Sequence, residues 1–308
     1  MIVIERVSKW YGRTEALSEV TMTIEKGYTY GLIGPNGAGK TTLMRILATI
    51  LAPSMGRVTI DGKRVTPSSV EVRRLIGYLP DYVGVYEDMQ VSEYLEFFAA
   101  AYGLKASERK TTITGVLQLT DLMSKRNSLI GTLSRGMQQR LGLARVLVHD
   151  PKVLLLDEPA SGLDPRARIE IRELLKELQA MGKTILISSH ILQDIAYMCN
   201  KIALIERGRL LYGGGIREAM ARVQTDHIWI VEVLEGPEKA MEILNRQPFV
   251  QQTEKKDTHV VVTTMDGAAD ALNIPRLLMD GGLHLQLFKR QEPTLEDAFL
   301  KLTKGIVS

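Results

Sequence analysis

The stretch Gly34-Pro35-Asn36-Gly37-Ala38-Gly39-Lys40-Thr41-Thr42 decides the fold of this chain, because it fits the phosphate-loop pattern G-x-x-x-x-G-K-[ST]. A strand-like run, Tyr28–Ile33, precedes the loop, and a helix-like run, Leu43–Ala48, follows it. In that setting the glycines let backbone N–H groups point at phosphate oxygens, and the helix N-terminus adds partial positive charge. The stretch therefore predicts a site for a nucleoside triphosphate.

Side chains of this loop are expected to divide the work of binding the triphosphate. Lys40 is placed to reach the β- and γ-phosphates, and the Thr41 hydroxyl to ligate Mg²⁺. A glycine turn that matches by chance is the alternative, and the flanking strand and helix argue against it. The other residues expected to contact the phosphates are Gly34, Asn36, Gly37, Ala38, Gly39 and Thr42.

The composition indicates a globular protein of two domains in a reducing compartment. The chain has 308 residues, and its net charge of +3 is too small to indicate a nucleic acid or an anionic membrane surface as partner. A single cysteine, Cys199, excludes an internal disulfide and lies in an apolar stretch, so a packed thiol is expected. No signal peptide is visible, and no apolar stretch approaches the roughly 18 residues of a membrane-spanning helix. We therefore expect a cytoplasmic chain, which could act at a membrane only through another chain.

Strand and helix patterns alternate along most of residues 1–220, which predicts an α/β domain with a mostly parallel sheet. Between about 88 and 150 the pattern is helical, so we expect a helical insertion into this domain. Residues 221–308 give the order β-α-β-β-α-β. This order predicts a small α+β C-terminal domain of ferredoxin-like arrangement.

Two carboxylates follow a buried strand. The run Val153–Leu156 is apolar throughout and ends in Asp157 and Glu158. Because ligand sites in parallel sheets gather at the carboxyl ends of strands, both acids are expected near the phosphate loop, as is His190, which also ends a strand. Asp157 is suited to hold Mg²⁺ through water, and Glu158 to take a proton from an attacking water. In the alternative, the two acids are solvated residues at the end of a strand and have no role in binding. The phosphate loop elsewhere in the chain argues against this alternative.

A second candidate anion site lies at the start of the segment Leu133–Arg140. Ser134 and Gly136 stand in the first turn of an expected helix, where a hydroxyl and free backbone N–H groups can bind an anion. A simple helix cap is the alternative. The helix start at the phosphate loop cannot contact both sides of a triphosphate that Lys40 already holds. A second copy of the chain could supply the Ser134 helix start to the other side across an interface.

Five motifs stand in the order found in an ATP-binding cassette (ABC) ATPase, and residues 1–220 resemble that family. The resemblance implies the P-loop NTPase fold, ATP with Mg²⁺, and a head-to-tail homodimer that sandwiches two ATP molecules. The motifs are the phosphate loop, Leu133-Ser134-x-Gly136-x-Gln138, Leu156-Asp157-Glu158-Pro159, Ser161-Gly162-Leu163-Asp164 and His190.

The resemblance also implies roles for single residues. Ser134 and Gly136 would contact the γ-phosphate bound by the partner copy, and Asp164 would link the two sites across the interface. His190 would hold the γ-phosphate and the attacking water. Tyr11 matches the aromatic residue that stacks on adenine, with Trp10 the weaker candidate; packing in the core is the alternative for both.

Two positions depart from the family pattern. Arg135 stands where the family usually has a glycine, and it could add positive charge near the phosphates or point to solvent. Asp81 ends the segment Ile76–Asp81, where the family normally has glutamine. A carboxylate cannot donate a hydrogen bond as an amide does, but it could hold Mg²⁺ through water.

The segment Glu292-Pro293-Thr294-Leu295-Glu296-Asp297-Ala298-Phe299-Leu300 looks like one found near the end of export-type ABC ATPases. In exporters of drugs, antibiotics or polysaccharides, the ATPase is a separate chain that serves a membrane permease. A helix capped by Thr294 is an adequate structural explanation of the same segment.

The resemblance thus implies the motor subunit of an ABC exporter, peripheral on the inner face of the cell membrane, with a separate transmembrane permease and no nucleic acid as partner. The alternative is a soluble ABC ATPase that acts on ribosomes or DNA. One cassette and no heptad run argue against that alternative. The cargo would be selected by the permease, so this sequence does not identify it.

Overall fold

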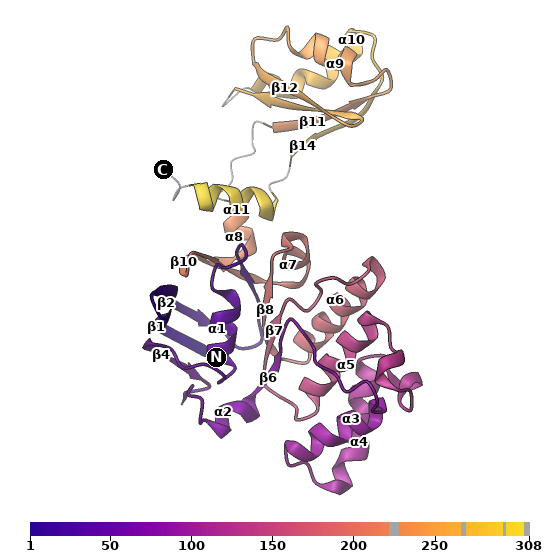
Figure 1. The fold of residues 1–308 in the computed structure, drawn as a ribbon. Helices are drawn as coiled ribbons and strands as arrows, with labels where there is room; N and C mark the ends of the chain where they lie inside the picture. Colours follow the sequence, from indigo (N-terminus) through magenta and orange to yellow (C-terminus); the bar gives the residue numbers. More distant parts are fainter. Residues whose placement is uncertain (222–227, 266–268, 292–293, 305–308) are drawn as a thin grey trace. The chain divides into compact units, whose positions relative to one another are not determined.

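The computed structural model describes residues 1–221, 228–265, 269–291 and 294–304 (Figure 1). Their contacts divide the chain into two compact units. The first unit comprises Met1–Ile216 together with the end of the last helix from Leu302, and the second comprises Arg217–Lys301. Each unit has its own sheets and its own buried apolar core.

A six-stranded sheet of order β10-β9-β3-β8-β7-β6 forms the centre of the first unit. All neighbouring strands run parallel except β10, which pairs antiparallel with β9 at one edge. The mostly parallel sheet expected from the sequence is therefore confirmed. The strands are β3 (Thr29–Ile33), β6 (Ile76–Leu79), β7 (Val153–Asp157), β8 (Thr184–Ser189), β9 (Lys201–Glu206) and β10 (Arg209–Gly215).

A second, antiparallel sheet of order β2-β1-β4-β5 was not expected as a separate layer. Helix α1 (Lys40–Leu47), which begins at the phosphate loop, buries Leu43, Met44, Ile46 and Leu47 in a core shared with strands of both sheets. The loop is thus held between two sheets. The strands are β1 (Ile2–Tyr11), β2 (Thr14–Ile24), β4 (Met55–Ile60) and β5 (Lys63–Arg64).

The helical insertion is confirmed: its three longer helices pack on one another, and α5 also contacts β6 (Figure 1). Its members are α3 (Val91–Ala101), α4 (Ala106–Leu119), η1 (Met123–Lys125), η2 (Ile130–Thr132) and α5 (Arg135–Leu147). Outside the insertion, the other helices between Met1 and Ala221 are α2 (Val70–Leu75), α6 (Pro165–Ala180), α7 (Leu192–Met198) and α8 (Ile216–Ala221).

Helix α6 begins at two residues that favour a helix start. Asp164 is the N-cap, and its Oδ1 accepts a hydrogen bond of 2.9 Å from the backbone N–H of Ala167. Pro165 occupies the first turn, where its missing N–H costs no hydrogen bond. The apolar stripe of this helix is buried, and consists of Ile171, Leu174, Leu175 and Leu178.

The second unit has the ferredoxin-like arrangement. Its antiparallel sheet has the order β12-β13-β11-β14, and residues of α9 and α10 share a single core with it. The elements are β11 (Ile228–Val233), α9 (Pro237–Leu244), β12 (Val250–Lys256), β13 (His259–Thr264), η3 (Ala269–Asn273), α10 (Ile274–Asp280), β14 (Leu285–Arg290) and α11 (Leu295–Lys304).

Thr294 caps α11 as expected. Its hydroxyl accepts from the Asp297 N–H at 3.1 Å, and the Asp297 carboxylate accepts from the Thr294 N–H at 2.9 Å. Glu292 and Pro293, which belong to the same motif, lie outside the described residues. Among the described helices, none is long and apolar enough to cross a bilayer.

The Cys199 thiol is packed in the core, where α7 ends against β3. A Cβ built on Gly31 would lie 3.2 Å from its Sγ, and burial raises the pKa of the thiol. Only the thiolate reacts with disulfide reagents.

We therefore expect an aromatic disulfide reagent at pH 8 to label the native protein at least about a hundredfold more slowly than the guanidinium-unfolded protein. A Cys199→Ser variant gives the background absorbance. Equal rates for native and unfolded protein would contradict the packed thiol.

Candidate nucleotide-binding site

A single pocket gathers most of the sequence-predicted residues around the phosphate loop. Asp81 comes from the segment after β6, and Glu158 from the turn after β7. Ala16 of β2 also lines it and was not predicted. The complete lining is Ala16, Asn36, Gly37, Ala38, Gly39, Lys40, Thr41, Thr42, Asp81 and Glu158.

Two glycines of the loop are required by close approach of other backbone. A Cβ on Gly34 would lie 2.2 Å from the carbonyl oxygen of Ile205, which belongs to β9. Gly39 has a φ of 106°, and its Cβ would lie 2.6 Å from the carbonyl oxygen of Ala16. The loop is therefore pressed against strands on both sides, and its curvature is set by the two sheets.

Lys40 is buried inside the curve of the loop. Its Nζ donates to the carbonyl oxygens of Gly34 at 2.7 Å and Pro35 at 3.2 Å. Burial lowers the pKa of the ammonium, whereas the charges of Glu158 and Asp157 oppose that change. A cation with two neutral partners and two carboxylates nearby is suited to bind a further anion.

Asp157 and Glu158 are held by one serine that the sequence analysis did not single out. The Ser188 hydroxyl donates to Oδ1 of buried Asp157, and its oxygen accepts the Glu158 N–H at 3.1 Å. The same N–H also lies 3.1 Å from the Ser188 carbonyl oxygen. Asp157 and Ser188 are direct neighbours in the register of β7 and β8. The sequence shows only a serine near the end of the strand before His190, and the register that pairs it with Asp157 is seen in the structure.

The turn after β7 places Glu158 against His190. Glu158 has a φ of 51°, a left-handed backbone that few non-glycine residues adopt, and its carbonyl accepts from the Ser161 N–H at 3.1 Å. Its Oε2 lies 2.9 Å from Nδ1 of His190. Glu158 and His190 therefore come from adjacent strand ends and contact each other, and Glu158 lines the pocket beside the loop.

Seven predicted residues are not among those that line this pocket, namely Tyr11, Gly34, Ser134, Gly136, Asp157, Asp164 and His190. Ser134 and Asp164 cap α5 and α6, and the Ser134 hydroxyl accepts from the Met137 N–H at 3.3 Å. Gly136 is buried against α6, since a Cβ there would lie 2.7 Å from that of Ala167. The start of α5 and the start of α6 are therefore side by side, but they do not close the pocket around Lys40.

Tyr11 is not a core residue. It ends β1 with 46 % of its surface exposed, and the Lys9 ammonium lies 5.6 Å from its ring centroid. Trp10 is half-buried. Tyr11 therefore has a free ring face available for stacking, as the adenine prediction requires, whereas Trp10 has less.

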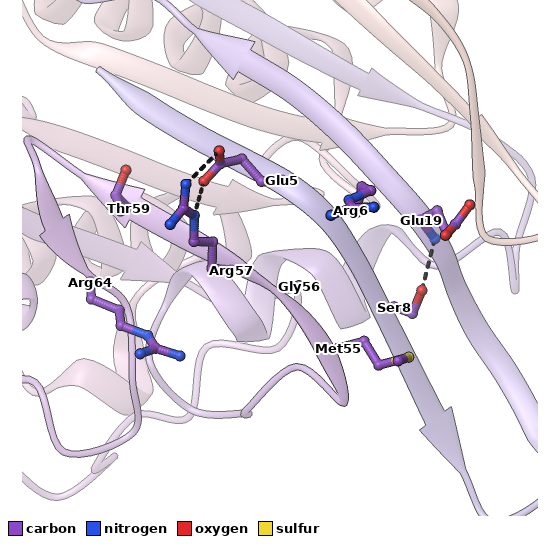
Figure 2. A pocket seen from close by; sticks show the side chains of 9 residues that line it. All are labelled: Glu5, Arg6, Ser8, Glu19, Met55, Gly56, Arg57, Thr59 and Arg64. Carbon is purple, nitrogen blue, oxygen red and sulfur yellow. Dashed lines mark hydrogen bonds and ion pairs between the residues drawn. The ribbon is translucent and has the colours of Figure 1, made fainter.

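A wider hollow opens on the antiparallel sheet, and it contains none of the sequence-predicted residues (Figure 2). Arg57 there is paired with Glu5, and the Ser8 hydroxyl accepts from the Glu19 N–H at 2.9 Å. Gly56 is the single glycine of its lining and the lining holds no lysine, so this surface lacks the run of glycines and the buried lysine of the phosphate loop. Its lining residues are Glu5, Arg6, Ser8, Glu19, Met55, Gly56, Arg57, Thr59 and Arg64.

Comparison with known proteins agrees with the site geometry. Residues 17–161 match a family model described as ABC transporter. The chain is 34% identical over 300 residues to the Nod factor export ATP-binding protein I of Rhizobium sp. (strain N33), covering 96% of this chain and 95% of that protein. The chain belongs to the ABC transporter ATP-binding proteins. A second relative, the uncharacterized ABC transporter ATP-binding protein YxlF of Bacillus subtilis (strain 168), is 33% identical and covers 98% and 99% of the two chains.

Solved structures support the ATPase assignment. The ABC transporter cassette MJ0796, 26% identical, has a TM-score of 0.63, covering 70% of this chain and 98% of that one, and was solved as a dimer. The same cassette was also solved in a post-hydrolysis state bound to ADP and Pi. The present chain is therefore an ATP-binding and ATP-hydrolysing ABC transporter subunit, and the alternative of a soluble ATPase on ribosomes or DNA has no support from these relatives.

The hydrogen bonds of the Ser188 hydroxyl to Asp157 and to the Glu158 N–H can be tested by substitution. In Ser188→Ala, Asp157 loses a hydrogen-bond donor and the Glu158 turn loses an acceptor, so we expect ATP hydrolysis to fall about tenfold while ATP binding is retained. Ser189→Ala is the matched control, because among the described residues the Ser189 hydroxyl accepts from the Ile191 N–H at 3.0 Å and is hydrogen-bonded to neither acid. Equal rates of ATP hydrolysis in the two variants would show that the Ser188 hydrogen bonds do not contribute to hydrolysis.

Proposed function

We propose that this subunit is the ATP-driven motor of an exporter, working on a separate transmembrane permease. The observation that carries the proposal is the convergence of Lys40, Glu158 and His190 at the end of one parallel sheet. A buried cation, a carboxylate and an imidazole at one edge are the groups that phosphoryl transfer to water requires. The closely related Nod factor export protein supports the export direction.

Glu158 is proposed as the general base. Its carboxylate lines the pocket with the loop, so it can take the proton of a water that attacks a γ-phosphate held by Lys40. His190 lies 2.9 Å from Glu158 and would hold the attacking water and the γ-phosphate. The backbone N–H groups of Asn36–Thr42 would hold the remaining phosphate oxygens.

The donor set of the pocket fits Mg²⁺. It offers the Thr41 hydroxyl and the Asp81 carboxylate, and buried Asp157 directly precedes Glu158 of the lining; oxygen ligands are those that Mg²⁺ prefers. Ser188 occupies only one oxygen of Asp157, which leaves the other available. Bound there, the ion would neutralise charge on the phosphates.

The active unit is proposed to be a head-to-tail homodimer. Ser134, Gly136 and Asp164 are not among the residues that line the pocket, and they stand at two adjoining helix starts. In a second copy these groups would face the γ-phosphate, and Tyr11 would stack on the adenine. The dimeric cassette among the solved relatives supports this arrangement.

The helical insertion and the segment after Asp81 are proposed to dock on the permease. Four aromatic side chains of this part are exposed, with Tyr82 the most exposed at 84 %. Exposed aromatic residues in one region are typical of protein interfaces. The other three are Tyr86, Phe97 and Tyr102. The motor would thus work at the inner face of the membrane, with no nucleic acid as partner.

Removing the Glu158 carboxylate tests the chemistry. In Glu158→Gln the amide cannot accept the proton, so we expect ATP with Mg²⁺ to bind normally and hydrolysis to fall by at least about a hundredfold. Hydrolysis is measured by phosphate release, and binding by equilibrium titration with a fluorescent ATP analogue. Near-normal turnover with bound nucleotide would remove Glu158 from the role of base.

The transporter assignment is tested by tagged purification from detergent-solubilised membranes of the source cell. We expect a multi-span membrane protein in stoichiometric amount, identified by mass spectrometry. Recovery should weaken when Tyr82 and Tyr86 are both changed to Ala, whereas Ile169→Ala, an exposed apolar residue on α6, is the matched control. Recovery of ribosomes or DNA-bound proteins without any membrane protein would contradict the proposal.

A further inference from the structure

Helices α6 and α7 are joined by a buried carboxylate. Asp194 of α7 is fully buried, and its Oδ1 accepts a hydrogen bond from Nη2 of Arg172 on α6. Nε of Arg168, one turn earlier on α6, lies 4.0 Å from the other oxygen, Oδ2. One carboxylate of α7 therefore faces two guanidinium groups of α6. We call these three residues the Asp194 clamp.

The Asp194 clamp leaves several of its buried polar atoms unsatisfied. Within the described residues, Oδ2 of Asp194 and the Nε atoms of Arg168 and Arg172 have no hydrogen-bond partner. Because removing charges from water is costly, a buried pair repays that cost only when its hydrogen bonds are complete. Stability alone therefore explains the clamp poorly. The clamp does fix position, since a shift of α7 along α6 would leave buried charges without their partners.

The clamp lies about one helical turn after His190. β8 ends at Ser189 and Ile191 is the N-cap of α7, so His190 is the single residue between the strand and the helix cap. Pairing with β3 and β7 holds the strand. The clamp holds the helix, as does Ile195, whose Cγ2 would lie 2.5 Å from a Cβ built on Gly31 of β3. The direction of the imidazole therefore depends on where α7 begins.

Helix α6, the other partner of the clamp, continues the segment that carries Glu158. The turn after Glu158 leads to Asp164, the N-cap of α6, and the Asp164 carbonyl accepts from the Arg168 N–H at 3.0 Å. Glu158 and His190, which lie 2.9 Å apart, thus each precede one of the two helices that the clamp joins. The contact between them depends on how α6 and α7 are held together.

We propose that Asp194 is a positioning residue for ATP hydrolysis, which keeps the His190 imidazole against the Glu158 carboxylate by holding α7 to α6. The inference rests on the roles proposed for Glu158 and His190 and deepens them. Asp194 is not among the residues that line the nucleotide pocket. It therefore acts through His190, and it exchanges no proton, atom or electron in the reaction.

Asp194→Asn removes the charge and keeps the size of the side chain. We expect kcat for ATP hydrolysis to fall at least about tenfold, because a misplacement of about 1 Å can cost about a hundredfold in rate. KM for ATP should change by less than about twofold, since Lys40 is held by the carbonyl groups of its own loop. Arg172→Ala should lower kcat as well, whereas Arg172→Lys, which keeps a cation beside Asp194, should recover a large part. Each rate is measured well below the Tm of the variant.

Tyr197→Phe is the matched control. The Tyr197 hydroxyl donates to Oε1 of Glu173 at 2.8 Å, so it also joins α7 to α6, but on the exposed side of the two helices. Substitutions at exposed sites have small effects, and we expect kcat to stay within about twofold. An equal loss of kcat in Tyr197→Phe and Asp194→Asn would overturn the inference, because the clamp would then have no role of its own.

A double-mutant cycle tests whether Asp194 acts through His190. In the His190→Ala background, Asp194→Asn should lower kcat by less than about twofold, since the group that it positions is gone. A full tenfold fall in that background would overturn the inference and leave the role of His190 in place. A His190→Ala protein with the kcat of the wild type would contradict the role proposed for His190, and the inference with it.

The position of the imidazole is measured without any need for activity, by NMR of full-length protein whose five histidines carry ¹³C at Cε1. The His190 signal is the one that is lost in His190→Gln. Glu158→Gln should shift this signal in otherwise wild-type protein, because the two side chains are in contact, and shift it less than about half as far in the Asp194→Asn background. An equal, measurable shift in both backgrounds would overturn the inference. A signal that moves in neither background would instead contradict the Glu158–His190 contact on which the proposed function rests, so the two failures are distinguishable.

Discussion

The site depends on one constraint, that the parallel strands β3, β7 and β8 end at the same edge of the central sheet. The phosphate loop leaves β3, the two carboxylates leave β7, and His190 follows β8. Their register then makes Ser188 the direct neighbour of Asp157, and its hydroxyl joins Asp157 to the turn of Glu158. Burial is what makes this bridge effective, because a carboxylate without a donor in that interior would be costly.

The same sheet also explains what one chain lacks. The central pocket contains Lys40 and Glu158, and His190 contacts Glu158, but Ser134 and Arg135 belong to a helix start that lies beside α6 and outside that pocket. A chain whose anion-binding groups lie on two separate surfaces is suited to act as a dimer, in which one surface of each copy faces the other surface of its partner. ATP would then be the ligand that both surfaces share, which links nucleotide binding to association.

Much of this arrangement could be predicted from the sequence, because its signals are local. The loop glycines, the apolar run before Asp157 and the cap at Asp164 each specify a short segment without help from distant residues.

The antiparallel sheet could not be predicted as readily. β2 alternates buried Val20, Met22 and Ile24 with exposed residues, a signal of period two, but its pairing with β1 is interrupted by irregular register. Gly213–Gly215 form the end of edge strand β10 and pair with β9, although glycine is depleted in strands. The contacts of Ser188 and of Asp194 depend on strand register and on the meeting of two helices, which no single segment encodes.

The measurement that tests the central claim most directly is an experimental structure of the Glu158→Gln protein with ATP and Mg²⁺. The account predicts two copies related head to tail, with each γ-phosphate between Lys40 of one copy and the Ser134-Arg135-Gly136 helix start of the other. A single copy whose bound ATP is enclosed only by its own residues would contradict the claim.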